Sequence, residues 1–249
     1  MDNPFISKND LTMIHLYFLI ALLNFQGFDD KMVLVEGNDS IKSCYMDKYE
    51  LTMAEFQLFV DETGHRTVSE VLDSGIVYNP YYKKVYGVHW RHDVYGQKIP
   101  IERYAELPVS RLTWKDAQAY AEWVGKRIPT KEEWLYAARG GSKSESFKYV
   151  GGNNARQVGW FDGNSRETLM PIGQKNPNEL GIYDLGGNLR ELALDLENNR
   201  IWGLGGSFFT DKDYFEIEYL ENGVYSSPQG FNRPASPLTG VRFVKDIKP

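Results

Sequence analysis

The 249-residue chain is poor in cysteine, with Cys44 as its single thiol. One cysteine cannot form an intramolecular disulfide, and zinc or iron–sulfur sites built from several cysteines are excluded within one chain. Free cysteine is among the most buried residue types. The strand-like stretch 43–49 therefore predicts that Cys44 is a small buried apolar side chain.

Histidine is scarce as well, and of the four histidines only His89 and His92 lie close together in the sequence. A two-histidine metal pair is one interpretation of this spacing, and packing of the rings within the fold is the favoured one. The sequence shows no nucleophile–histidine–acid arrangement, no glycine-rich phosphate loop and no metalloprotease motif.

Basic residues are fewer than acidic ones: the chain has 28 Lys and Arg and 34 Asp and Glu, which gives a net charge of −6. Without a basic run, this balance argues against a nucleic-acid partner. The chain also lacks internal repeats, heptads, low-complexity tracts and an interdomain linker. With 42% hydrophobic and 14% aromatic residues, it has the composition of a soluble globular domain with a sizeable core.

Residues 11–25 form an almost uncharged apolar run. The run is shorter than the roughly 20 residues of a membrane span, and its length suits the apolar region of a signal peptide. We therefore predict an apolar leader at 1–30, a domain at 31–249, and export to the periplasm, the cell surface or the medium. In the alternatives, translation starts at Met13, or the run is a mature helix or strand docked on the core of a cytoplasmic protein.

Local signals in the first half of the chain predict helices and short strands. Each helix begins at a threonine that serves as an N-cap, and each ends at glycine. The caps are Thr52, Thr113 and Thr130, and strands are expected at 32–36 and 44–49. After about residue 142, Gly, Asn, Asp and Pro recur every few residues and indicate loops. The fold class is α+β with little regular secondary structure and a strand-poor second half.

Seven segments of the chain follow one another in an order that is typical of one known family. They are CYMDKYELTMAEFQLFV (44–60), GVHWRH (87–92), PVSRLTWKDAQAYAEWVGKRIPTKEEWLYAARGG (108–141), VGWFDGNS (158–165), NELGIYDLGGNLREL (178–192), WGLGGSFF (202–209) and TGVRFV (239–244). In these segments the chain resembles the formylglycine-generating enzyme, or sulfatase-modifying factor, family. The resemblance implies the fold of that family, a variant of the C-type lectin fold.

The resemblance also implies a structural calcium site in the segment 178–192. Asp184 and Glu191 would supply carboxylate oxygens, and Gly187 and Leu189 would supply backbone carbonyls. These oxygen donors suit a hard cation. In the alternative, Asp184 caps a turn and Glu191 pairs with a nearby arginine. A second calcium site of the family would fall near 153–164, without an assignment of its ligands.

The oxidase chemistry of the family uses a cysteine pair that binds Cu(I) and follows the GGS motif. Soft thiolates select Cu(I), and in this chain Phe215 and Leu220 are expected at the two positions. No copper and no catalytic residues are therefore predicted.

Two functional hypotheses from different classes remain. The first is a non-catalytic pseudoenzyme: a binding or scaffold protein for protein or carbohydrate ligands, in a secreted or membrane-associated assembly, as in bacterial relatives of this fold. Its ligand would lie on the C-terminal face formed by 208–225, against Tyr214, Phe215, Glu218 and Tyr219. About half of the aromatic residues in this segment are expected to fill the core instead. The second hypothesis is an oxidoreductase or peptide-modifying enzyme with altered metal chemistry.

Overall fold

The computed structural model describes residues 31–226 and 235–247. The predicted leader at 1–30 lies outside these residues, so export stays a prediction. Among the described residues, no helix has the length and apolar character needed to cross a bilayer.

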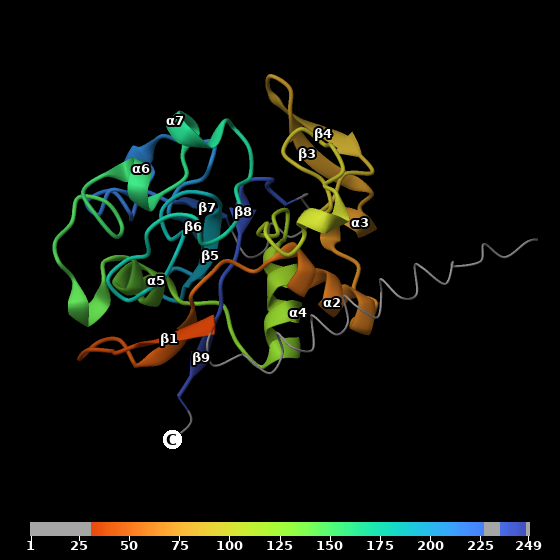
Figure 1. Ribbon diagram of the computed structural model, residues 1–249. Coiled ribbons are helices and arrows are strands. Elements are labelled where there is room, and N and C mark those ends of the chain that lie inside the picture. The colour runs from red at the N-terminus through yellow and green to blue at the C-terminus, as the bar shows by residue number, and fades with distance from the viewer. Residues whose placement is uncertain (1–30, 227–234, 248–249) are drawn as a thin grey trace, which may run out of the picture.

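Both ends of the described chain meet in one antiparallel sheet. It contains β1 (Met32–Val35), β2 (Cys44–Asp47) and β9 (Val244–Asp246) in the order β1-β2-β9. The two strands predicted near the N-terminus are confirmed, each ending slightly earlier than expected. Pairing of β2 with β9 joins segments almost two hundred residues apart and closes the domain (Figure 1).

The three predicted helices are present, and each begins with a complete capping box. They are α2 (Met53–Thr63), α4 (Trp114–Val124) and α5 (Lys131–Ala138). In each box the threonine hydroxyl accepts from the backbone of the third helical residue, whose carboxylate accepts from the threonine N–H. Gly64 and Gly125 end α2 and α4 in the left-handed conformation that glycine adopts without strain.

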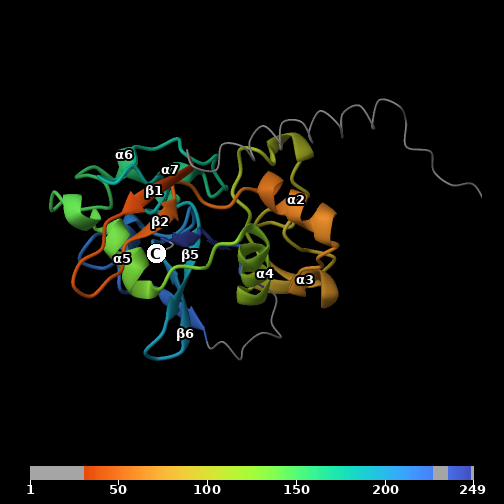
Figure 2. The same cartoon turned by 90° about the horizontal axis from the view of Figure 1, so that it is seen from below.

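Shorter helices complete the helical part of the described chain. They are α3 (Val68–Val71), α6 (Ala155–Val158), α7 (Asp162–Ser165), η2 (Ile101–Arg103), η3 (Gly141–Lys143) and η4 (Lys212–Phe215). Viewed from below, α2, α3 and α4 gather on one side of the molecule, whereas α5 lies beside β1, β2 and β5 on the other (Figure 2).

The second half holds more strand than the sequence predicts. It contains a four-stranded sheet of β5 (Arg190–Asp195), β6 (Arg200–Leu204), β7 (Val224–Ser226) and β8 (Thr239–Gly240), in the order β7-β6-β5-β8. Most side chains of β5 are buried on both faces, so the polar–apolar alternation that marks a half-buried strand is missing. The sequence signal for this sheet is therefore weak.

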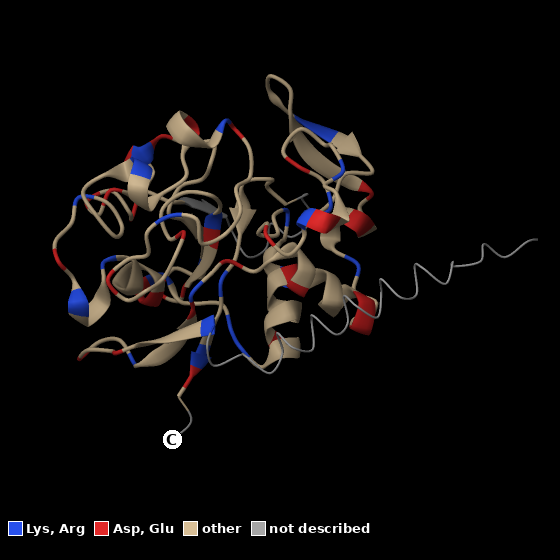
Figure 3. Cartoon of the chain, viewed as in Figure 1, with Lys and Arg blue, Asp and Glu red and all other residues tan. Residues whose placement is uncertain are grey.

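A separate hairpin lies at the end of the molecule opposite β1 and β9 (Figure 1). It is formed by β3 (Ser74–Tyr78) and β4 (Tyr82–Tyr86), which pair in antiparallel register. All residues of β4 except Val85 are exposed. Acidic and basic residues are interspersed over the described chain (Figure 3).

Two large apolar clusters form the core. One surrounds α2 and α4 and contains Phe56 and Trp90, whose rings meet edge to face with centroids 5.1 Å apart. The other surrounds α5 and contains Trp134, which is fully buried. The Nε1 of Trp134 donates to the Glu191 carboxylate at 2.7 Å, so the helix of the KRIPTKEEW motif is anchored to β5.

Candidate functional site

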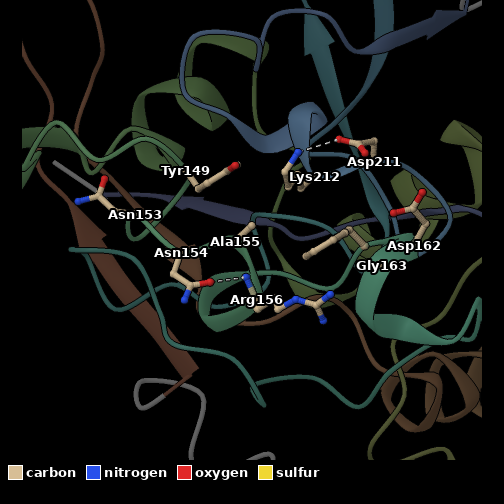
Figure 4. A pocket seen from close by; sticks show the side chains of 10 residues that line it. Tyr149, Asn153, Asn154, Ala155, Arg156, Asp162, Gly163, Asp211 and Lys212 are labelled. Atoms are coloured by element: carbon tan, nitrogen blue, oxygen red, sulfur yellow. Dashed lines mark hydrogen bonds and ion pairs between the residues drawn. The ribbon is translucent and has the colours of Figure 1, made fainter.

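A depression of about 540 Å³ lies next to the start of the segment 208–225, for which a ligand-binding face is predicted. This volume is within the range of about 300–1,000 Å³ that is typical of ligand pockets. Two chain segments line it, one within 149–163 and the other at 211–212 (Figure 4). The depression is the candidate ligand site of this fold, and we call it the loop pocket.

Backbone hydrogen bonds hold the two walls of the loop pocket together. Val150 N–H donates to the carbonyl of Phe215 at 3.2 Å, and Asp162 N–H donates to the carbonyl of Thr210 at 3.0 Å. On the first wall, the Asn154 side chain accepts from Arg156 N–H at 3.1 Å and caps α6. These bonds fix the pocket although its walls contain little regular secondary structure.

The loop pocket presents mixed polar chemistry. Arg156 and Lys212 are its cations, Asp162 and Asp211 its anions, and Asn153, Asn154, Tyr149 and Phe161 supply amides and rings. The Lys212 ammonium lies 2.9 Å from Asp213 and 3.6 Å from Asp211. The hydrogen bond to Asp213 holds the pKa of Lys212 above its ordinary range. Donors, acceptors and aromatic faces of this kind suit a polar ligand such as a peptide or a sugar.

Of the predicted ligand-binding residues, three lie on the surface and one does not. Tyr214 and Tyr219 are 42% and 45% exposed, and Glu218 is exposed as well. The prediction for Phe215 is corrected, because its side chain is fully buried and contacts the rings of Tyr149 and Phe161 beneath the loop pocket. An aromatic-rich segment does not reveal by composition which of its rings face inwards.

The sequence did not assign the residues of the first wall. Their only sequence signal is the run 153–164, near which a second calcium site is predicted without assigned ligands. The partnership of this run with 211–212 depends on hydrogen bonds between segments about fifty residues apart. Such long-range contacts leave no local pattern in the sequence.

Glu191, a predicted calcium ligand, is fully buried and pairs with Arg242. Its Oε1 accepts from Nη2 of Arg242 at 2.5 Å, and its Oε2 accepts from Nε at 2.6 Å and from Trp134. Arg242 also donates to the backbone carbonyls of Asp47, Lys48 and Tyr183. The arginine partner that was the alternative to calcium is therefore present.

Asp184, the second predicted carboxylate ligand, is buried, and no described Lys or Arg forms an ion pair with it. Its Oδ2 accepts from Gly173 N–H at 2.6 Å, whereas its Oδ1 is buried with no hydrogen-bond partner in the described part of the chain. Burial raises the pKa of Asp184 to about 6. Oδ1 is thus an oxygen atom that could coordinate a cation.

The backbone positions of the predicted calcium set are tightly packed. A Cβ on Gly187 would lie 1.9 Å from the carbonyl oxygen of Trp160, and Leu189 is 1% exposed. No group of three or more His, Cys, Asp or Glu side chains in the described ranges converges on one point as metal ligands. Of the predicted calcium ligands, Asp184 alone has a free carboxylate oxygen among the described residues, so the set fits a calcium ion only in part. The calcium ion stays a prediction.

Cys44 is 1% exposed within β2, as predicted. Burial raises the pKa of its thiol to about 11, so the reactive thiolate is disfavoured at neutral pH.

The rings of His89 and His92 pack edge to face with centroids 4.7 Å apart. Leu220 is buried like Phe215, so apolar core side chains occupy both positions where the copper-binding cysteines were expected.

Comparisons with known proteins place these features in context. Residues 27–247 match the family profile of the sulfatase-modifying factor enzyme 1-like domain. The chain is 29% identical to the formylglycine-generating enzyme of Mus musculus over 206 residues, which are 68% of this chain and 55% of that enzyme. It therefore spans about half the length of that relative.

Two further relatives are named differently from the active enzyme. The inactive C-alpha-formylglycine-generating enzyme 2 of Mus musculus is 32% identical over 180 residues, covering 61% of this chain and 58% of the relative. The chaperone protein LppX of Paenibacillus barcinonensis is 28% identical over 255 residues, covering 76% and 82%.

Solved structures share the fold at lower identity. PvdO from Pseudomonas aeruginosa superposes with a TM-score of 0.61 at 18% identity, over 83% of this chain and 81% of that chain. CarF superposes with a TM-score of 0.58 at 19% identity, over 84% and 88%. These likenesses concern the fold alone, which is the α+β fold predicted from the sequence.

Proposed function

The chain belongs to the sulfatase-modifying factor enzyme 1-like family, and we propose that it is a non-catalytic member that binds a protein or carbohydrate ligand in the loop pocket. One observation carries the proposal. The single cysteine of the chain is buried in β2, so the chain has no pair of accessible thiolates that could hold Cu(I) and engage a substrate cysteine.

The relatives support a role without the family's oxidation chemistry. One relative at 32% identity is named an inactive enzyme, and another at 28% identity is named a chaperone. A chaperone acts on polypeptides, and the mixed charges and amides of the loop pocket suit a polypeptide or a sugar. A fold whose reactive cysteines are absent can keep the pocket and bind a ligand without transforming it.

The non-catalytic half of the proposal predicts that the protein forms no formylglycine. A sulfatase-type cysteine peptide is incubated with the purified chain, copper and oxygen, and the products are followed by mass spectrometry. We expect unchanged peptide, because Cys44 is buried and has no second cysteine to share a copper ion. An active formylglycine-generating enzyme serves as the positive control. An aldehyde product from the unsubstituted chain would contradict the proposal, and its persistence in a Cys44→Ala variant would favour altered metal chemistry.

The binding half of the proposal predicts that a ligand's affinity depends on the loop pocket. The labelled chain is screened on peptide and glycan arrays, and the strongest hit is then titrated by calorimetry. We expect Arg156→Ala and Lys212→Ala each to weaken binding by about fivefold to tenfold, since each removes a charged hydrogen-bond donor from the pocket wall. The matched control is Arg103→Ala, an exposed arginine in η2. If Arg156→Ala and Lys212→Ala bind the ligand as tightly as Arg103→Ala and the unsubstituted chain do, the ligand binds outside the loop pocket.

A further inference from the structure

Arg190 begins β5 next to Glu191, yet the two side chains cannot pair. Successive side chains of a strand point to opposite faces of a sheet. Glu191 faces inwards, where it is fully buried against Arg242. Arg190 therefore lies on the other face of β5, and its neighbour in the sequence is already committed to another arginine.

Two arginines of the described chain, Arg111 and Arg242, are fully buried, and both are well satisfied. Arg242 pairs with Glu191 and donates to backbone carbonyls. Arg111 donates to the carbonyls of His92, Ile76 and Asp93 at 2.5–3.1 Å. Both arginines recover, through these bonds, the hydrogen bonds with water that they lose on burial.

Arg190 is partly buried and differs from these two. Within 31–226 and 235–247, its side chain makes no hydrogen bond and no ion pair, and its Nε is buried without a partner. A buried N–H that has lost water without gaining an acceptor costs free energy. An incoming anion would supply the missing acceptor, so the position is suited to binding one.

Two exposed tyrosines, Tyr82 and Tyr214, lie near the Arg190 side chain. Burial lowers the pKa of this group, and the phenols of Tyr82 and Tyr214 lie close enough to oppose that shift. Tyr82 is 51% exposed and Tyr214 is 42% exposed, so both reach solvent. The ring of Tyr78 contacts Tyr82 at 5.2 Å and Phe209 at 4.7 Å, which ties the β3–β4 hairpin to the segment after the GGS motif.

We propose that Arg190 binds a carboxylate of an acidic polypeptide segment that lies along β4. The planar fork of a guanidinium matches the two oxygens of a carboxylate. A single arginine balances a single negative charge, which favours a carboxylate over a dianionic phosphate. None of these residues lines the loop pocket, so the proposal does not rest on ligand binding there.

The free edge of the hairpin favours a polypeptide over an acidic glycan. On the side of β4 away from β3, no strand of the described chain is paired with it. An extended peptide can add to such an edge through its backbone. Tyr82, Lys84 and Tyr86 alternate onto one face of β4, all exposed, and present two aromatic rings and a positive charge. An acidic peptide is complementary to this face and to Arg190.

Calorimetric titration of the full chain tests the proposal. The probe is acetyl-Glu-Gly-Glu-Gly-Glu-amide, with the glutamine peptide of the same length as its neutral counterpart and tri-galacturonate as the acidic glycan. We expect the glutamate peptide to bind at least about tenfold more tightly than the glutamine peptide, as charged hydrogen bonds imply. Arg190→Gln should remove this preference, and Arg190→Lys should keep part of it.

Controls separate this site from other surface arginines and from misfolding. Arg103→Gln should leave affinity for the glutamate peptide unchanged, since Arg103 is an exposed arginine in η2. The melting temperature of Arg190→Gln without ligand should equal or exceed that of the unsubstituted chain. Equal affinity of Arg190→Gln and the unsubstituted chain for the glutamate peptide would overturn the proposal. Binding of tri-galacturonate without binding of the peptide would overturn its assignment to a polypeptide.

Discussion

Replacing Arg242 with methionine is expected to lower the free energy of unfolding by about 3–5 kcal/mol, as is typical when one partner of a buried ion pair is removed. Arg242 and Glu191 are both fully buried, and their pair involves both carboxylate oxygens. Methionine fills part of the volume but leaves the Glu191 charge and three backbone carbonyls without their donor. Urea unfolding at neutral pH, followed by tryptophan fluorescence, measures the loss.

Two further variants separate the charge effect from packing. The double variant Arg242→Met with Glu191→Gln should recover part of the lost stability, because it leaves no unpaired buried charge. Arg190→Met is the matched control on the same sheet, and it should cost less than about 1 kcal/mol, since Arg190 has no partner within the described residues. A loss below about 1 kcal/mol for Arg242→Met would contradict the structural role of the pair.

Local features of the fold were accessible from the sequence because their partners are close in the chain. Thr52 and Glu55 are three residues apart, and their reciprocal hydrogen bonds form whenever a helix begins there. The pairing of Arg242 with Glu191 joins residues 51 positions apart. The family motifs contain both residues, yet only the folded chain shows that Arg242 is the partner of Glu191.

The candidate site could be predicted from the sequence only in small part. The segment 208–225 contributes Asp211 and Lys212 to the loop pocket, but none of the four predicted ligand-binding residues lines it. Phe215 was misassigned because a ring on a short helix in a glycine-rich region carries no periodic signal for burial. Arg190 has no sequence signature as a binding residue, since its significance lies in the hydrogen-bond partners that it lacks.

Stability is expected to fall by about 2–3 kcal/mol as the pH rises from about 4 to about 7, through the ionisation of Asp184 alone. Its pKa of about 6 in the fold exceeds the ordinary value of 3.8, because burial disfavours the charged carboxylate. The native state therefore holds one more proton than the unfolded state in the window between these values, and it loses this advantage above pH 6. Burial beside Asp184 and Glu191 raises the pKa of Glu50 as well, with the same sign.

The Asp184→Asn variant isolates this contribution from those of other carboxylates. Asparagine mimics the protonated acid, and it tolerates the left-handed backbone at this position, where φ is 56°. The variant should match the unsubstituted chain near pH 4 and exceed its free energy of unfolding by about 2–3 kcal/mol near pH 7, in chelator. Asp162→Asn, at an exposed carboxylate, should show no such pH-dependent difference. A constant difference between pH 4 and pH 7 for Asp184→Asn would contradict the assignment.

The same comparison decides the predicted calcium ion. A cation bound at Oδ1 of Asp184 would favour the ionised carboxylate, so it would oppose the effect of burial on the pKa of this group. Calcium at about a hundred times its Kd would then raise the stability of the unsubstituted chain at pH 7 by about 2.7 kcal/mol and flatten its pH profile. Asp184→Asn would gain much less. If calcium changes the free energy of unfolding of neither the unsubstituted chain nor Asp184→Asn, no calcium ion offsets the cost of burying the Asp184 carboxylate. The Arg242–Glu191 pair is then the ionic interaction that stabilises this segment.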